Sequence, residues 1–161
     1  MFTLDCAGAD KQHSLCNGQA EPLTVHGATS SRSSAIFDLD DDGDLDIITS
    51  ENSDHPQVLI SDLSERRSIH FLKVKLVGTT SNRDALGALV QVHAGGRVYT
   101  QFNDGKSGYL SQGSIPLYFG LSDATRVDKI EVRWPSGQKG VFPPLTAVNR
   151  QVTLTEPNNL R

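Results

Sequence analysis

Long hydrophobic runs are missing from this sequence of 161 residues. No apolar run approaches the roughly 18 residues of a membrane-spanning helix, and the first residues, MFTLDCAGADKQ, lack the basic start and apolar segment of a signal peptide. We therefore expect a soluble chain with no membrane insertion. Met1 is compatible with an added start, in which case the natural protein is longer on that side.

A basic surface is also missing. Lys and Arg number 15 against 19 Asp and Glu, and the formal net charge is −4. No stretch combines basic and aromatic residues in the way that binds phosphates or stacked bases. We therefore expect no nucleic-acid partner.

The motifs of common enzyme classes are absent. The nearest approach to G-x-S-x-G, GKSGY at 105–109, lacks the final glycine in register, and there is no H-E-x-x-H or phosphate-binding glycine loop. The five histidines form no i,i+2 or i,i+4 pair, so no transition-metal site is expected. We expect no catalysis, although the paired acids of a glycoside hydrolase come from distant strands and leave no local signature.

Cysteine is scarce, with only Cys6 and Cys16 in the chain. Neither lies in a C-x-x-C motif or near a histidine at metal-binding spacing. Two readings stay open: a disulfide that closes this short loop in an exported protein, or two free thiols.

What the sequence does contain is a set of short alternating segments after residue 67. In HFLKVKLVG, Leu72, Val74 and Leu76 alternate with lysines, as in a strand that is buried on one face. Similar runs follow, separated by Gly, Asn and Pro. Trp134 alternates in step with Ile130 and Val132, so we expect it in the core. No segment has a helical period over ten residues. The pattern predicts an all-β fold with an antiparallel β-sandwich.

The segment AIFDLDDDGDLDIITSE at 35–51 concentrates six aspartates between Asp38 and Asp46. Their mutual repulsion should keep such a loop open unless a cation closes it. Acids fall at positions 1, 3, 5, 7 and 9 and Gly43 at position 6, a spacing that wraps a chain around a hard cation such as Ca²⁺. Position 12 is Thr49, so this is not an EF-hand. The alternative is a solvated acidic loop that binds nothing.

We assign the expected ligands residue by residue. The carboxylates of Asp38, Asp40, Asp42 and Asp46 and the backbone carbonyl of Asp44 are predicted to bind Ca²⁺, while Asp41 points outward.

Two segments resemble known families. AIFDLDDDGDLDIITSE is similar to an FG-GAP or VCBS-type calcium-binding repeat, a blade element of β-propellers. The motifs that follow resemble the ASPIC/UnbV domain, as in the cartilage acidic protein family. They are SNRDALGALVQVHAGG at 81–96, GYLSQGS at 108–114, LYFGLSDATRVDKIEVRWPSGQ at 117–138 and the closing run to VTLTE.

The resemblance implies a domain organisation. We expect an irregular segment at 1–34, a single blade-like calcium-loop hairpin at 35–66 packed against an ASPIC/UnbV-like β-sandwich at 67–157, and a tail at 158–161. One repeat cannot form a propeller of four to eight blades.

The resemblance also implies a secreted or cell-surface module. We expect a non-catalytic, calcium-stabilised binding or adhesion module for a protein or glycan. The alternative is a carbohydrate-active protein, either a binding module or a small polysaccharide-degrading enzyme, with structural calcium. Possible ligand contacts are Tyr99, Tyr109 and Tyr118. The oligomeric state is left open.

Overall fold

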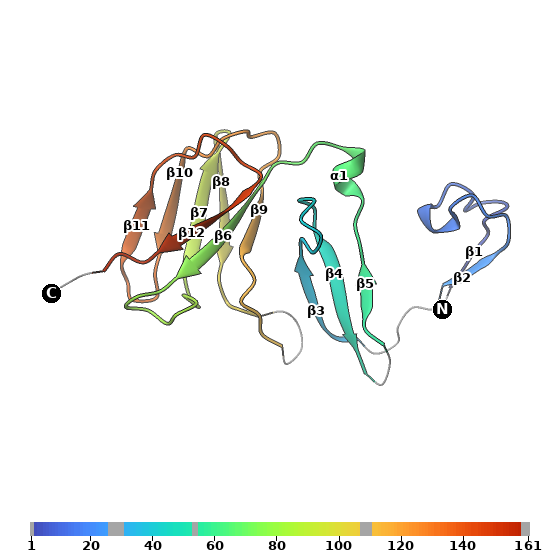
Figure 1. Ribbon diagram of the computed structural model, residues 1–161, viewed down its shortest axis with the longest axis horizontal. Coiled ribbons are helices and arrows are strands. Elements are labelled where there is room, and N and C mark those ends of the chain that lie inside the picture. The colour runs from blue at the N-terminus through green and yellow to red at the C-terminus, as the bar shows by residue number, and fades with distance from the viewer. Residues whose placement is uncertain (1, 26–30, 53–54, 107–110, 159–161) are drawn as a thin grey trace.

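The computed structural model describes residues 2–25, 31–52, 55–106 and 111–158. Strands dominate, and the expected all-β sandwich is confirmed (Figure 1). No helix in these residues is long and apolar enough to cross a membrane.

The sandwich consists of two sheets formed by residues 71–155. The strands of the larger sheet, in spatial order, are β11 (Lys139–Phe142), β10 (Lys129–Arg133), β7 (Leu89–Ala94) and β8 (Arg97–Phe102). The strands of the smaller sheet are β12 (Arg150–Thr155), β6 (Phe71–Val77) and β9 (Leu117–Gly120). All neighbours pair antiparallel except β12, which runs parallel to β6. A parallel pair requires a long connection, and here the rest of the sandwich supplies it.

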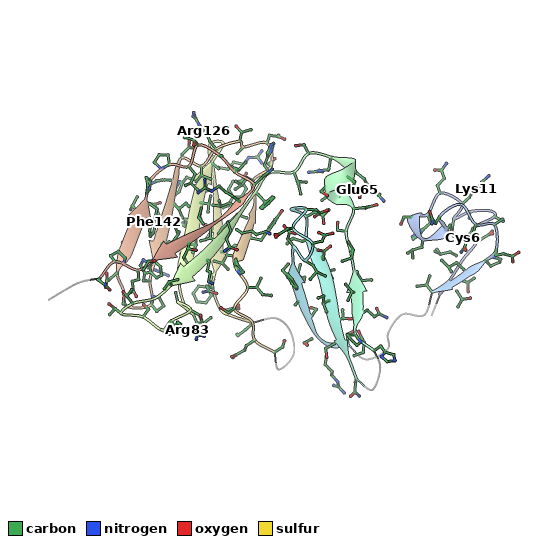
Figure 2. The ribbon with its side chains drawn as sticks, in the orientation of Figure 1. Cys6, Lys11, Glu65, Arg83, Arg126 and Phe142 are labelled. Carbon is green, nitrogen blue, oxygen red and sulfur yellow. A yellow bond between two sulfur atoms is a disulfide. The ribbon has the colours of Figure 1, made fainter. Side chains whose placement is uncertain are left out.

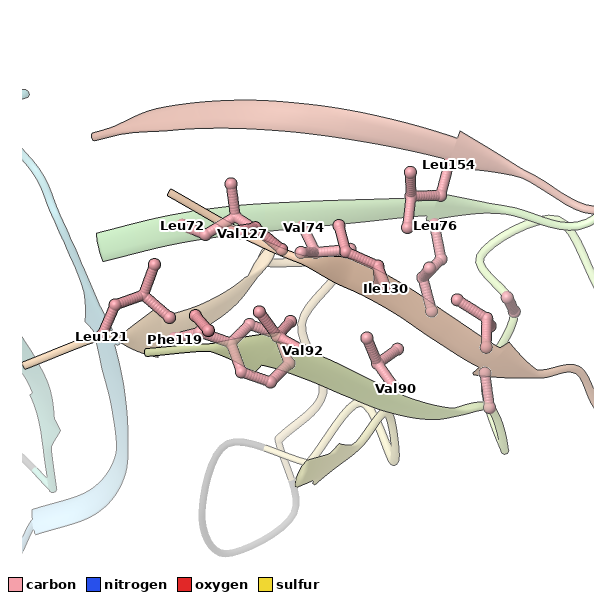
Figure 3. Packing of buried hydrophobic residues seen from close by; sticks show 14 of the residues in the cluster. Leu72, Val74, Leu76, Val90, Val92, Phe119, Leu121, Val127, Ile130 and Leu154 are labelled. Atoms are coloured by element: carbon pink, nitrogen blue, oxygen red, sulfur yellow. The ribbon is translucent and has the colours of Figure 1, made fainter. Parts of the chain in front are cut away.

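Alternating side chains fill the space between these sheets (Figure 3). Leu72 and Val74 of β6 are 0% and 1% exposed, as their alternation with lysines predicts. Trp134, only 2% exposed, is a core residue as expected. The sandwich therefore has its own hydrophobic core and offers a rigid outer face for other segments.

A second unit precedes the sandwich, a sheet of three strands in the order β3 (Ser31–Phe37), β4 (Asp46–Glu51) and β5 (Gln57–Leu59). The aspartate-rich segment is the loop between β3 and β4, and Phe37 pairs with Asp46 across its base. The hairpin begins at Ser31 rather than residue 35. It also gains a third strand and a helical turn, α1 (Leu63–Arg66), which the sequence pattern did not predict.

The N-terminal segment is more ordered than the irregular stretch expected for 1–34. β1 (Phe2–Leu4) and β2 (Leu23–Val25) form a two-stranded antiparallel sheet, and a 3₁₀ turn, η1 (Ser14–Cys16), lies between them. A disulfide joins Cys6 to Cys16, which decides between the two readings of these cysteines. Both are fully buried with Leu4 in a small cluster of their own. These strands have three residues each, too few for a periodic signal.

Candidate metal centre

The loop between β3 and β4 brings three aspartates together. One carboxylate oxygen each from Asp38, Asp40 and Asp42 lies within 4.8 Å of the others, and this is the only such acidic, histidine or cysteine cluster in the described parts of the chain. Gly43 has φ +98°, a conformation that glycine adopts without strain, and allows the loop to turn. The three alternate side chains thus converge as their spacing predicts.

Asp38 is the buried member of this cluster. Its side chain is 0% exposed, whereas Asp40 and Asp42 are exposed residues. Neither of its carboxylate oxygens has a hydrogen-bond partner among the described residues. Its Oδ2 atom lies 2.7 Å from the Nζ atom of Lys73, in an ion pair. A buried carboxylate oxygen without a donor is costly, and a cation would satisfy it.

The other two predicted ligands make different contacts. Both carboxylate oxygens of Asp46 accept backbone hydrogen bonds, from the N–H of Leu39 at 2.8 Å and that of Ser61 at 2.9 Å. Asp44 accepts one from the N–H of Ser64 at 2.8 Å, and its second oxygen is buried without a hydrogen-bond partner among the described residues. The side chains of Asp44 and Asp46 therefore fix the loop to the segment that follows β5, outside the three-aspartate cluster. The contributions of the Asp46 carboxylate and of the Asp44 carbonyl stay predictions.

The helical turn α1 closes the loop from one side. In Figure 2 Glu65 marks this turn, and carboxylate oxygens gather beside it at the end of the hairpin. The hydroxyl of Ser64 donates to Oδ2 of Asp42. This hydrogen bond and one from the Asp44 N–H lower the pKa of Asp42, so it stays ionised in mildly acidic solution. Desolvation, followed by repulsion from Asp42 and Asp46, raises the pKa of Asp40.

The opposite side of the loop rests on the outer face of the smaller sandwich sheet. The hydroxyl of Tyr118 donates to the carbonyl of Gly43 at 2.6 Å, and the ring of Tyr118 stacks on that of Phe71 with centroids 5.4 Å apart. A Cβ atom added to Gly43 would stand 2.4 Å from the Phe71 ring. The glycine is therefore required both for its backbone conformation and for the close approach of the sandwich.

Lys73 and Tyr118 are direct cross-strand neighbours in β6 and β9. Partial burial tends to lower the pKa of Lys73, but its contacts with Asp38 and Asp41 outweigh this and raise the pKa. Burial, then the negative charges of Asp38 and Asp44, raise the pKa of Tyr118 to about 12. At neutral pH the loop thus faces one ammonium group and one neutral phenol.

The donor set fits a hard divalent cation. Carboxylate oxygens are the ligands that Ca²⁺ prefers, and Asp38, Asp40 and Asp42 would hold the ion, with the unpaired Oδ1 of Asp38 as its buried ligand. The ion would supply charge neutralisation and cross-link the loop. Asp41, with a side chain 92% exposed, points outward as expected, although its Oδ1 accepts a 3.1 Å hydrogen bond from Lys73.

The predicted ligand-contact tyrosines lie in different places. Tyr99 is partly buried against the sandwich core and donates to the carbonyl of Leu121 at 3.2 Å, whereas Val98 beside it is 52% exposed. Tyr99 therefore faces the sandwich core, whereas a ligand contact at this position would need an exposed side chain. Tyr118 belongs to the contact with the aspartate-rich loop, and Tyr109 lies outside the described residues. The structure does not bring Tyr99 and Tyr118 together on one exposed surface.

A cleft of about 420 Å³ opens between β3 and the sandwich, next to Tyr118. Its walls include the exposed side chains of Ile36 and Phe102, and polar groups of Gln101, Asn103 and Asp104. Aromatic and amide groups on one wall can bind a ligand that has both apolar and polar faces.

Three residues that hold the site were not predicted: Ser61, Ser64 and Lys73. Ser61 lies 15 residues after its partner Asp46, and Ser64 lies 20 residues after its partner Asp44. Lys73 belongs to the sandwich, a different unit from the loop. The only local signal for Lys73 was its outward position in an alternating strand, which is common to most surface lysines.

Comparison with known families agrees with the sandwich. The ASPIC and UnbV family matches residues 78–161, just over half of the chain. The match starts after β6, although β6 is a central strand of the same sandwich, and it leaves the aspartate loop outside. No curated protein matches the chain. This chain belongs to the ASPIC and UnbV family.

Proposed function

We propose that the chain is a non-catalytic, calcium-stabilised extracellular binding module that recognises a protein or a glycan. In this proposal residues 35–66 are a calcium-binding repeat of the FG-GAP or VCBS type. The observation that carries it is the cluster of Asp38, Asp40 and Asp42, with a fully buried carboxylate oxygen that lacks a hydrogen bond within the described chain. A solvated acidic loop that binds nothing would leave such an oxygen exposed to water.

The role of the cation follows from the contacts of the loop. The same short segment contacts α1 through Ser64 and the sandwich through Tyr118 and Lys73. An ion that offsets the repulsion among the aspartates would therefore hold the hairpin sheet on the sandwich. The Cys6–Cys16 disulfide supports an extracellular location, because disulfides persist in oxidising compartments.

Strand edges support a protein partner. β3 and β5 are the outer strands of their three-stranded sheet, so each has one neighbour within the described chain. Val58 and Leu59 of β5 are 52% and 53% exposed. An extended peptide could pair with such an edge through backbone hydrogen bonds.

The cleft beside Tyr118 favours a glycan as the second candidate ligand. Phe102, 55% exposed, offers a ring for stacking on a sugar, and Gln101, Asn103 and Asp104 offer hydrogen-bonding groups. Replacement of Phe102 by Ala should abolish binding on a glycan array if this cleft is the site, and should leave it unchanged if the ligand binds elsewhere.

The calcium site is tested by thermal unfolding of metal-stripped protein titrated with Ca²⁺ and, in parallel, Mg²⁺. Calcium at about 100 times its Kd should raise the Tm by roughly 5–10 °C, the shift expected for about 2.7 kcal/mol in a domain of this size. Asp38→Asn and Asp40→Asn should abolish the rise. The control is Asp123→Asn, which removes the same charge from an exposed sandwich turn and should leave the rise in Tm unchanged. No shift with either ion would refute the proposal.

A further inference from the structure

Lys73 is the sandwich residue that contacts the buried aspartate of the loop. Its Nζ atom lies 2.7 Å from Oδ2 of Asp38 and 3.1 Å from Oδ1 of Asp41, and 5.6 Å from the centre of the Phe71 ring. Its side chain is only 16% exposed. The ammonium group is therefore held in place on one side of the aspartate cluster.

The two oxygens of Asp38 are both buried, and neither has a hydrogen-bond partner among the described residues. Oδ2 is the one that forms the ion pair with the Lys73 ammonium. Any cation that Oδ1 binds must share this carboxylate with a positive charge that is already present. Because the whole side chain is 0% exposed, water screens this competition poorly.

We infer that Lys73 sets the calcium affinity of the loop, because its ammonium neutralises the Asp38 carboxylate in advance and repels a divalent cation held there. The inference rests on the proposed calcium site. It makes the affinity of the loop a property of the docked sandwich, since Asp38 belongs to the hairpin unit and Lys73 to β6.

A purely structural role for Lys73 predicts the opposite change in calcium affinity. If Lys73 only anchored Asp38 in position, its removal would loosen the cluster and weaken calcium binding. If it competes with the ion, its removal tightens binding. Repulsion between a unit charge and a divalent ion about 5 Å apart corresponds to about tenfold in affinity even at the dielectric constant of water.

The experiment is calorimetric titration of the whole metal-stripped chain with CaCl₂. Lys73→Met keeps an unbranched apolar side chain and removes the charge, and Lys73→Arg keeps the charge. Lys75→Met removes the same charge from the same face of β6, two residues farther along the strand. We expect Lys73→Met to lower the Kd by about tenfold, and Lys73→Arg and Lys75→Met to stay within about threefold of the unchanged protein.

Each outcome has a distinct meaning. Calcium binding that is unchanged or weaker in Lys73→Met overturns the role of Lys73 but leaves the calcium site standing. Equal tightening in Lys75→Met also overturns it, since the effect would then be one of net charge. No binding in any variant refutes the proposed function and this inference with it. Lys73→Gln, which keeps a hydrogen-bond donor for Asp38, replaces Lys73→Met in the same comparison should the latter fail to fold.

Discussion

Glu156 provides the sharpest test of how the sandwich is stabilised. This carboxylate is 2% exposed and lies just after β12. Its Oε2 atom accepts hydrogen bonds from the backbone N–H groups of Thr79, Thr80 and Ser81, at 2.9, 2.9 and 2.7 Å. Its Oε1 atom accepts hydrogen bonds from the hydroxyls of Ser81 and Ser136. One side chain therefore fixes two loops to the C-terminal strand.

These hydrogen bonds determine how strongly the ionised carboxylate is favoured. Burial alone would raise the pKa of Glu156, but the hydroxyl and backbone donors outweigh it and lower the pKa from 4.5 to about 2. A shift of this size corresponds to roughly 3 kcal/mol of folding free energy. Since the pKa is lowered in the folded state, this stabilisation is complete above about pH 4.5 and is lost as the pH falls toward 2.

The perturbation is Glu156→Gln, which keeps the size of the side chain and removes its charge. At pH 7 we expect the variant to lose roughly 3 kcal/mol of unfolding free energy, because a neutral amide forms weaker hydrogen bonds with the same donors. Urea titration followed by fluorescence of Trp134 measures this, since the chain has one tryptophan and it lies in the sandwich core.

The pH dependence separates the charge from simple loss of packing. The difference in unfolding free energy between the original protein and Glu156→Gln should shrink as the pH falls from 4.5 toward 2, where Glu156 itself becomes protonated. Glu21→Gln, at an exposed N-terminal position, is the control. It should change the unfolding free energy by no more than about 0.5 kcal/mol, both at pH 7 and in acid. A difference below about 0.5 kcal/mol at pH 7, or one that does not shrink in acid, would refute the reasoning.

Two further predictions concern the other units of the chain. Gly43→Ala should lower the free energy of unfolding by about 1–3 kcal/mol and abolish the calcium-dependent rise in Tm, because the new Cβ would clash with the Phe71 ring. The control is Gly137→Ala, with φ +88° and open space around it, which should show only the smaller cost of backbone strain. An equal loss of stability in both variants would contradict this. Replacement of Cys6 and Cys16 by Ala should destabilise the β1–β2 element by about 3 kcal/mol, seen as faster proteolysis, while the tryptophan-detected unfolding stays the same. A loss of sandwich stability would show that the two units are coupled.

Sequence reasoning predicted the features that depend on local patterns. Burial alternates strictly along β7 and β10, so the alternation alone places Val90, Val92, Ile130 and Val132 in the core, where they lie. The convergence of Asp38, Asp40 and Asp42 also follows from spacing within one loop, since their relative positions depend on a few consecutive residues.

The contacts that distinguish the aspartates from one another could not be predicted in this way. Asp46 is occupied by a backbone N–H 15 residues away, and Asp38 by a lysine of the next unit. Such partners depend on how the hairpin folds back through α1 and where it meets the sandwich. A single sequence carries no signal for pairs at that separation. The inward orientation of Tyr99 in β8 could not be predicted for a related reason, since the strand has apolar side chains on both faces, Val98 and Phe102 on one and Tyr99 on the other.

Strand β6 connects the two charged sites of the molecule. Its first residues, Phe71 and Lys73, contact the aspartate-rich loop, and the backbone just beyond its last residue supplies the N–H groups that bind Glu156. The N–H and carbonyl of Phe71 are also held by Asn149, just before β12, so both ends of β6 are fixed to the C-terminal strand that pairs with it. The backbone of Lys73 therefore belongs to the sandwich, and its ammonium group is part of the surface against which the aspartate-rich loop packs.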